Sequence, residues 1–400
     1  MVRLRLTAVA AAWALTTVPA ACRQSERADE EVGAAVVADV MSEIGSDESA
    51  GPEYVFGSIS AVALGPQDRV YVADRQSSNV RVFTADGVHL RTIGREGDGP
   101  GEFRVPSDLV FFGSELWVAD VNRIQQFLPR VPGGVPDSVG VTRVLTGYAN
   151  TSGQRSRVID GDYYYPRYFY PIGGGFRYFY EVFRAKGGID TIAVPPVRNL
   201  ERVRRASYRG ARVSRAEHAL VSTLSQAPFE PKASWDLTGR GTIVAGPGTS
   251  TALQEFDALG NVLEEIELPF ARREIPTAER LDTAQALTAR LRQLSVPLQE
   301  VENVSGFLLD GELPDSLPTH LAIHVAVDDR IWVRTWPSGP PAQGTEFAVI
   351  SPQHSFESLI RIPVQLSSDV APYFRGNQVT GVIADPATGA QTVVVARAGR

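Results

Sequence analysis

The chain has 400 residues, of which 43% are hydrophobic, and its formal net charge at pH 7 is −7. This composition supplies enough apolar surface for a substantial core, and the acidic balance argues against nucleic acid as a partner. Because Cys22 is the only cysteine, an intramolecular disulfide is excluded and the core must stabilise the fold unaided.

The N-terminus has the layout of an export signal. Arg3 and Arg5 precede an apolar run from Leu6 to Val18, which is too short to span a bilayer as a stable helix. The stretch "VPAAC" then ends at Cys22 and resembles the lipobox of bacterial lipoproteins, although Pro19 stands where that motif usually carries leucine. The resemblance implies that Cys22 is lipidated and becomes the mature N-terminus. The alternative is ordinary cleavage nearby, which leaves a free thiol.

These features predict how the chain is processed and where it is found. We expect residues 1–21 to be a signal peptide and residues 22–33, which are polar and acidic, to be a tether. The protein is then exported and anchored in the cell envelope as a lipoprotein, and is otherwise periplasmic or secreted. Membrane attachment is expected through the lipid anchor only, and the protein is expected to be a monomer.

From about residue 34 onward the chain reads as many short strands. Apolar runs with a period of two are separated by Gly, Pro and Asp turns. Two stretches share one pattern, an apolar strand that ends in V-A-D and a second strand with Arg near its start: "RVYVADRQSSNVRVF" (69–83) and "ELWVADVNRIQQF" (115–127). Asp74 and Asp120 are separated by about one repeat of ~45 residues, which is the length of a four-stranded propeller blade. Each aspartate is predicted to bind turn N–H groups and the nearby arginine, which is a structural role.

The glycine-rich stretch "IGREGDGPGEF" (93–103) lies between the last strand of one repeat and the first strand of the next. Its glycines allow positive φ, and Pro100 restricts the bend. No helix follows, so the helix N-terminus that a phosphate loop requires is missing, and the acidic spacing does not match a calcium loop. We therefore predict a crossing between blades.

Residues 59–127 resemble the NHL-type repeat of secreted bacterial six-bladed β-propellers, through V-A-D, Arg, Phe, D-G and G-x-x-G-x-G-P-G-E-F. The resemblance implies an all-β fold of six four-stranded antiparallel blades over residues 34–400. We expect residues 33–45 to supply the fourth strand of the last blade, because this closure removes open sheet edges. The expected innermost strands are 58–64, 105–112, 155–160, 232–238, 319–327 and 378–384.

One stretch, "PTAERLDTAQALTARLRQL" (276–294), has the spacing of a helix. We predict a single amphipathic helix, capped by Thr277, in an insertion at about 276–301 between the fourth and fifth blades. It either packs on one propeller face without a function or controls access to a site. Its apolar stripe consists of Leu281, Ala284, Leu287, Leu291 and Leu294.

Innermost strands line the central channel of a propeller. Their alignment places Asp108, Asp236 and His324 at one level, where they could bind a ligand or hold calcium or zinc. The alternative is a polar channel filled with water, which requires no cofactor.

An aromatic run, "YYYPRYFYPIGGGFRYFYEVF" (163–183), supplies the other candidate ligand-binding residues. Because side chains alternate across a strand, three consecutive tyrosines cannot all point inward, so we expect some to be exposed. The candidates are Tyr164, Tyr168 and Tyr178, and the alternative is packing between blades.

Two functions are compatible with this reading. The first is a non-enzymatic binding or scaffolding protein of the cell envelope that recognises a protein, peptide or glycan on a propeller face near the channel. The alternative is a metal-dependent hydrolase or lyase, of the lactonase or amidating-lyase kind, that uses channel residues. A close ring of Glu, Asp, Asn or His around the axis would favour the enzyme, and the sequence offers more Ser, Thr and apolar residues there.

Overall fold

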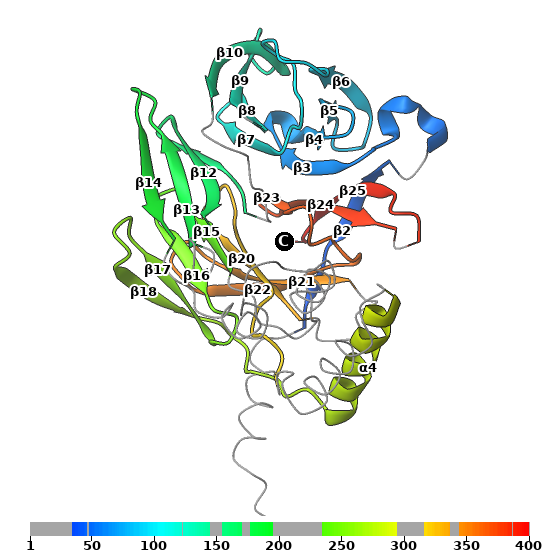
Figure 1. The fold of residues 1–400 in the computed structure, drawn as a ribbon, viewed down its shortest axis with the longest axis vertical. Helices are drawn as coiled ribbons and strands as arrows, with labels where there is room; N and C mark the ends of the chain where they lie inside the picture. Colours follow the sequence, from blue (N-terminus) through cyan, green and yellow to red (C-terminus); the bar gives the residue numbers. More distant parts are fainter. Residues whose placement is uncertain are drawn as a thin grey trace, which may run out of the picture.

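The computed structural model describes residues 34–45, 48–121, 123–144, 154–169, 177–194, 234–293, 316–336, 344–385 and 387–399. Six sheets form a ring of blades (Figure 1), and each blade contains four antiparallel strands. In blades 1 to 5 these strands follow chain order from the axis outward, while blade 6 takes its outermost strand from the N-terminal segment. The fold is the predicted six-bladed β-propeller.

The first three blades come from residues 59–193. Blade 1 contains β3 (Ile59–Leu64), β4 (Val70–Asp74), β5 (Asn79–Phe83) and β6 (His89–Ile93). Blade 2 contains β7 (Asp108–Phe112), β8 (Glu115–Asp120), β9 (Arg123–Pro129) and β10 (Pro136–Val144). Blade 3 contains β11 (Arg157–Ile159), β12 (Asp162–Phe169), β13 (Arg177–Phe183) and β14 (Ile189–Ala193). Short 3₁₀ turns lie at Glu48–Ala50, Pro52–Tyr54 and Pro66–Asp68.

The last three blades come mainly from residues 234–397. Blade 4 contains β15 (Ser234–Leu237), β16 (Ile243–Gly246), β17 (Ala252–Phe256) and β18 (Val262–Glu267). Blade 5 contains β19 (Ala322–Val325), β20 (Ile331–Thr335), β21 (Thr345–Ile350) and β22 (Phe356–Ile362). Blade 6 contains β23 (Tyr373–Arg375), β24 (Gln378–Ala384), β25 (Gln391–Arg397) and the N-terminal β2 (Asp39–Ile44).

The predicted helix is present as α4 (Thr277–Gln293), which lies between blades 4 and 5 in the chain and at the edge of the ring (Figure 1). A capping residue precedes the first helical residue, but Thr277 is itself the first residue of α4. The helix therefore begins one position earlier than predicted. Leu281 of the predicted stripe is 45% exposed. No helix within the described ranges is both long and apolar enough to cross a membrane.

The N-terminal segment closes the ring, as predicted. β2 pairs antiparallel with β25, with Ile44 opposite Val393. In addition, β1 (Val36–Val37) pairs in parallel with β22 of blade 5, which the sequence pattern did not indicate. One continuous segment is therefore bonded to both blades 5 and 6.

The predicted innermost strand of blade 6 is wrong. Residues 378–384 form β24, the second strand, and the innermost strand is β23. The sequence signal for β23 is weak because the strand has three residues, between Pro372 and the positive-φ Gly376. A strand this short shows no alternating pattern.

The core lies between the blades. Tyr163 and Tyr165 of β12 pack with Trp117 of blade 2, while Tyr164 packs with Trp235 of blade 4. All three tyrosines are buried, so the expectation that one of them is exposed is wrong. The expectation assumed one solvated sheet face, but in a ring each blade has a neighbour on both faces.

The V-A-D aspartates are structural, as predicted. The Asp74 carboxylate accepts hydrogen bonds from the backbone N–H groups of Gly57 and Ser58, both at 3.0 Å, and forms an ion pair with Arg81 at 3.4 Å. Asp120 accepts backbone N–H groups in the same way at the start of blade 2. Each carboxylate therefore holds the chain as it enters a blade.

The two faces of the ring differ. We call the face where the innermost strands begin the entry face, and the opposite face the turn face. Because the strands alternate in direction, the glycine-rich crossing joins β6 to β7 at the entry face, with positive φ at Gly94, Gly97 and Gly101. The strands that flank the longest connections, β14 to β15 and β18 to β19, also meet this face. The turn face carries only short hairpins in the described part of the chain.

Candidate functional site

Asp108, Asp236 and His324 lie on the innermost strands of blades 2, 4 and 5, and all three are buried. Asp108 Oδ2 accepts a hydrogen bond from the backbone N–H of Ser156 at 2.7 Å. Asp236 Oδ2 accepts one from the N–H of Val325, also at 2.7 Å. Each carboxylate therefore links its own blade to the next one, because Ser156 directly precedes β11 and Val325 lies on β19.

Burial changes the acid–base properties of these groups. It raises the pKa of Asp108 and of Asp236, while Arg155 and Arg157 act in the opposite direction. For His324, burial and then the nearby arginines Arg155 and Arg334 lower the pKa to about 3. The imidazole is therefore neutral at pH 7.

Two arginines of blade 3 reach across the axis. Arg155 Nη2 donates hydrogen bonds to Val62 O of blade 1 at 2.8 Å and to Ala371 O, before blade 6, at 2.5 Å. Arg157 Nη2 donates to the carbonyl groups of Val325 and Ala326 in blade 5. Because these blades are not neighbours of blade 3, the guanidinium groups must span the channel.

These two arginines were not among the site residues predicted from the sequence. The available signal was their i, i+2 spacing in "RSRVI" on an expected innermost strand, which places both on one strand face. Which blades they contact could not be read from that spacing.

The three channel candidates do not form a metal-binding group. Among the residues that the structure describes, the ligand atoms of Asp108, Asp236 and His324 do not form a set lying within 4.8 Å of one another. The centre is instead crossed by two guanidinium groups, and a cavity of only about 10 Å³ remains beside Asp108 and Arg155. The two guanidinium groups accompany the two carboxylates at the axis, and all four side chains link one blade to another.

A larger cavity of about 440 Å³ opens on the entry face of blade 5. We call it the blade 5 pocket. Its lining comes from the end of blade 4, from the strand ends of blade 5 and from the N-terminal segment: Ala34, Ala35, Phe270, Ala271, Arg273, Leu317, Pro318, Thr319, Thr335, Trp336, Glu346, Leu359 and Arg361. No sequence motif marked this site, because its members are scattered along the chain.

Polar side chains that line the blade 5 pocket already form hydrogen bonds within the protein. Glu346 is 1% exposed, and its Oε1 receives Arg361 Nη2 at 2.6 Å and Nε at 2.8 Å. Thr319 Oγ1 donates a hydrogen bond to Ser250 O at 2.5 Å. The aromatic and aliphatic residues form the remaining walls.

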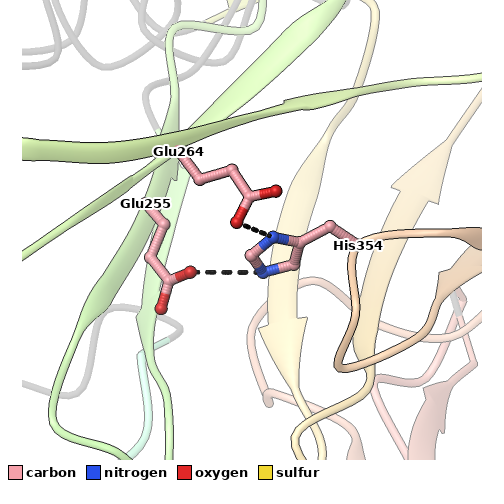
Figure 2. A group of neighbouring side chains, drawn as sticks. All are labelled: Glu255, Glu264 and His354. Carbon is pink, nitrogen blue, oxygen red and sulfur yellow. Dashed lines mark ion pairs between the residues drawn. The ribbon is translucent and has the colours of Figure 1, made fainter.

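A third group lies on the turn face between blades 4 and 5 (Figure 2). Glu255 and Glu264 are direct cross-strand partners, and the ring of His354 lies between them. His354 Nε2 is 3.2 Å from Glu255 Oε2, and Nδ1 is 2.9 Å from Glu264 Oε2. The three ligand atoms lie within 4.8 Å of one another, so the group could hold a metal ion.

His354 occupies an unusual backbone position. Its φ is +64°, while the equivalent hairpins of blades 1, 3 and 4 have glycine there, Gly87, Gly187 and Gly260. The left-handed conformation costs a non-glycine residue roughly 1 kcal/mol. The two ring nitrogens face different carboxylates, so these two close contacts join blades 4 and 5.

Of the remaining candidate residues, two have side chains that the structure describes and two do not. Tyr164 and Tyr178 pack with Trp235 between blades 3 and 4, and the ring centroids of Tyr178 and Trp235 are 4.2 Å apart. The side chain of Tyr168 and all of Cys22 lie outside the described residues.

Comparisons with known proteins concern the fold. A family model described as a 6-bladed beta-propeller matches residues 52–117, the region of the clearest repeat. The chain is a six-bladed β-propeller. No curated protein matches this propeller significantly.

Several solved structures are similar to this propeller. A member of the DUF4221 family from Bacteroides vulgatus is 11% identical, with a TM-score of 0.48 and coverage of 90% of this chain and 97% of that one. Virginiamycin B lyase from Staphylococcus aureus is 10% identical, with a TM-score of 0.36 and coverage of 85% and 94%. A gluconolactonase from Xanthomonas campestris is 11% identical, with a TM-score of 0.39 and coverage of 92% and 98%.

Proposed function

We propose that this propeller is a non-enzymatic binding protein of the cell envelope that takes its ligand on the entry face. The proposal rests on one observation, which is that side chains cross the central channel and already bind the backbone of other blades. Arg155 and Arg157 bind carbonyl groups of blades 1, 5 and 6, and Asp108 and Asp236 accept backbone N–H groups. A channel-based hydrolase or lyase requires such carboxylates to be available to a metal or substrate.

The blade 5 pocket supports the location of binding. Its volume of about 440 Å³ is within the range of small-molecule sites, roughly 300–1,000 Å³. It combines apolar walls with a few polar groups, which is the usual composition of such sites. A protein, peptide or glycan could present a group of this size to the entry face.

The envelope location is part of the proposal and rests on the N-terminal sequence. Arg3 and Arg5, the apolar run and the stretch "VPAAC" support export and lipidation at Cys22. Residue 34 lies at the blade 5 pocket. A tether over residues 22–33 would therefore join the anchor to the same region of the propeller.

The test separates binding from catalysis. The mature chain with Cys22→Ser is screened by thermal shift against glycans, peptides and small molecules, and is assayed for hydrolysis of gluconolactone with added Ca²⁺ or Zn²⁺. We expect saturable binding that Phe270→Ala weakens, with no metal-dependent turnover. Turnover that is lost in Asp236→Asn would replace this proposal with the hydrolase or lyase alternative.

Metal analysis of the purified protein completes the test, because a binding protein can also carry calcium or zinc. The analysis therefore has to show at which site any metal is held. Glu264→Gln distinguishes the turn-face group from the channel, because Glu264 is one of the three potential ligands there. Bound metal that is lost in Glu264→Gln but kept in Asp236→Asn would locate it away from the axis and leave the binding proposal intact.

A further inference from the structure

We infer that Glu255, Glu264 and His354 form a zinc site that joins blades 4 and 5 on the turn face of the propeller. The site is separate from the proposed function, because it lies on the face opposite the blade 5 pocket and holds a metal ion rather than the ligand. Three features support it, namely the ligand atoms, the charges around them and the contacts that hold Glu255.

The three side chains converge from two blades (Figure 2). Glu255 on β17 and Glu264 on β18 are direct cross-strand partners, so their side chains lie on one face of blade 4. His354 belongs to the hairpin between β21 and β22 of blade 5, and one ligand atom of each residue lies within 4.8 Å of the other two. Ligand atoms around a tetrahedral zinc ion lie about 3.3 Å apart. The distance from His354 Nε2 to Glu255 Oε2 is 3.2 Å, which fits this spacing.

The donor set favours zinc over calcium or magnesium. Calcium takes about six to eight oxygen ligands, and magnesium also prefers oxygen, whereas an imidazole nitrogen suits zinc. Two carboxylates and one imidazole are three protein ligands, which is the number found in zinc sites where water takes the fourth position. The group therefore has the composition of a zinc site that remains open to one water molecule or exogenous ligand.

The charges of the group favour a cation. Two carboxylates that lie directly opposite one another on a sheet repel each other. Within the described part of the chain, the only guanidinium in contact with them is that of Arg240, whose Nη2 is 3.1 Å from Glu255 Oε1. The Glu264 carboxylate contacts the His354 imidazole, which must be neutral to bind a metal. Two negative charges and one positive charge then leave the group with an excess negative charge.

The contacts of Glu255 hold its carboxylate in place. Oε1 accepts a hydrogen bond from the Thr242 hydroxyl and the shorter of two from Arg240 Nη2, while Oε2 faces the imidazole of His354. Hydrogen bonds of this kind orient a metal-binding carboxylate and strengthen metal binding. The side chains of Glu255 and His354 are 5% and 8% exposed, but that of Glu264 is 57% exposed. An ion can therefore enter from solvent on the side of Glu264.

Zinc binding to the mature Cys22→Ser chain tests the inference, because this variant also removes the only thiol. Titration calorimetry with zinc chloride is compared with calcium chloride and magnesium chloride, on untagged protein freed of metal. We expect zinc to bind at a single site, and calcium and magnesium to bind at least about tenfold more weakly. Co²⁺ in place of zinc should give the visible absorption of a four-coordinate site.

Two variants remove one ligand each. Glu264→Gln and His354→Gly should both weaken zinc binding at least about tenfold, the minimum effect of disturbing the surroundings of a metal ligand. Glycine suits position 354, because it adopts positive φ without strain and the equivalent hairpins of three other blades have glycine there. A loss of zinc binding in His354→Gly is therefore not explained by misfolding, and circular dichroism confirms the fold of each variant.

Glu265→Gln is the matched control for Glu264→Gln. Glu265 is the next residue of β18 and is exposed, and its side chain points to the other face of the strand. This variant should keep the zinc affinity within about twofold, an effect well below the loss expected for a ligand. Zinc should also raise the thermal midpoint of the parent chain and of Glu265→Gln, but not of the two ligand variants, because an ion that binds only the folded state stabilises it.

Four results would overturn the inference. The first is a parent chain that does not bind zinc, and the second is calcium binding that is as tight as zinc binding. The third is an equal loss of affinity in Glu264→Gln and Glu265→Gln, which would reduce the effect to general electrostatics. The fourth is zinc binding that survives His354→Gly, which would place the metal elsewhere. None of these results decides the proposed function, which depends on ligand binding and its loss in Phe270→Ala.

Discussion

At the scale of single residues, His324 shows how burial determines protonation. Its ring packs near Phe374 and Phe347, with centroid distances of 5.6 and 6.4 Å. The nearby cations Arg155 and Arg334 further disfavour a charged imidazole. The folded protein therefore holds His324 neutral, while the unfolded chain binds a proton at its ordinary pKa.

This difference predicts loss of stability in acid. The pKa of His324 falls from 6.5 to about 3 on folding, so its contribution is complete above pH 6.5 and is lost as the pH falls toward 3. Between pH 6.5 and 5 the loss is roughly 2 kcal/mol. Urea unfolding at both pH values should show a smaller loss in His324→Gln than in the wild type.

Other buried groups also change their pKa on folding, so the pH dependence of the wild type alone does not isolate His324. The comparison with His324→Gln is therefore necessary. His320 has a pKa lowered to about 4 and contributes a second loss in acid. Burial raises the pKa of Asp108 and Asp236, which acts in the opposite direction. An unchanged pH dependence in His324→Gln would show that His324 is not the group responsible.

At the scale of elements, the N-terminal segment closes the ring twice. β2 completes blade 6 and buries Ile44, and β1 adds a short parallel pair to blade 5. Without β2, β25 would expose an unpaired row of N–H and C=O groups. The two contacts can be removed one after the other, because β1 precedes β2 in the chain.

Stepwise removal of this segment predicts graded stability. A chain that begins at Arg23 keeps both strands, one that begins at Asp39 loses β1, and one that begins at Gly51 loses both. We expect thermal midpoints to fall in that order, with the larger step at β2, since the loss of one buried Ile side chain alone costs about 2–5 kcal/mol. Equal midpoints for the first and last chains would show that closure contributes nothing.

At the scale of the whole molecule, the axis joins blades that are distant in the ring. Arg155 donates hydrogen bonds to Val62 O of blade 1 and to Ala371 O, just before blade 6, and Asp108 is the acidic group that acts most strongly on its charge. Arg157 makes the corresponding link to blade 5. Blade 3 is therefore held by its neighbours and by contacts across the channel.

Arg155→Met should destabilise the propeller by about 3–5 kcal/mol, because the carbonyl groups of Val62 and Ala371 lose charge-assisted hydrogen bonds that contribute about 1.5–3 kcal/mol each, and the buried Asp108 loses a nearby positive charge. Chemical denaturation measures this cost. Arg95→Met, at a side chain that is 81% exposed, should have little effect. Adding Asp108→Asn to Arg155→Met should recover part of the loss, and the absence of any recovery would argue against this charge compensation.

Attachment to the membrane is tested on the whole protein. Cys22→Ser should release the protein from membrane fractions, because stable attachment requires acyl chains buried in the bilayer. Cell fractionation and mass spectrometry of the mature N-terminus provide the measurement. A wild-type protein that is soluble, with another N-terminal residue, would contradict lipidation.

The sequence by itself determined the fold class, five of the six innermost strands, the helix and the closure by β2. These features are encoded locally, in period-two strands, in V-A-D turns and in the glycine-rich crossing, because backbone geometry and turn chemistry act over a few residues. The β23 strand was missed because it is too short to carry that periodicity.

Only the tertiary structure decided which surfaces are covered and which side chains meet. Tyr163 to Tyr165 are all buried because a blade is covered on both faces, and Arg155 finds its partners only after the ring closes. The blade 5 pocket combines Ala34 with residues as distant as Arg361. Such contacts depend on how whole blades are arranged around the axis, and no periodicity within a single strand specifies that arrangement.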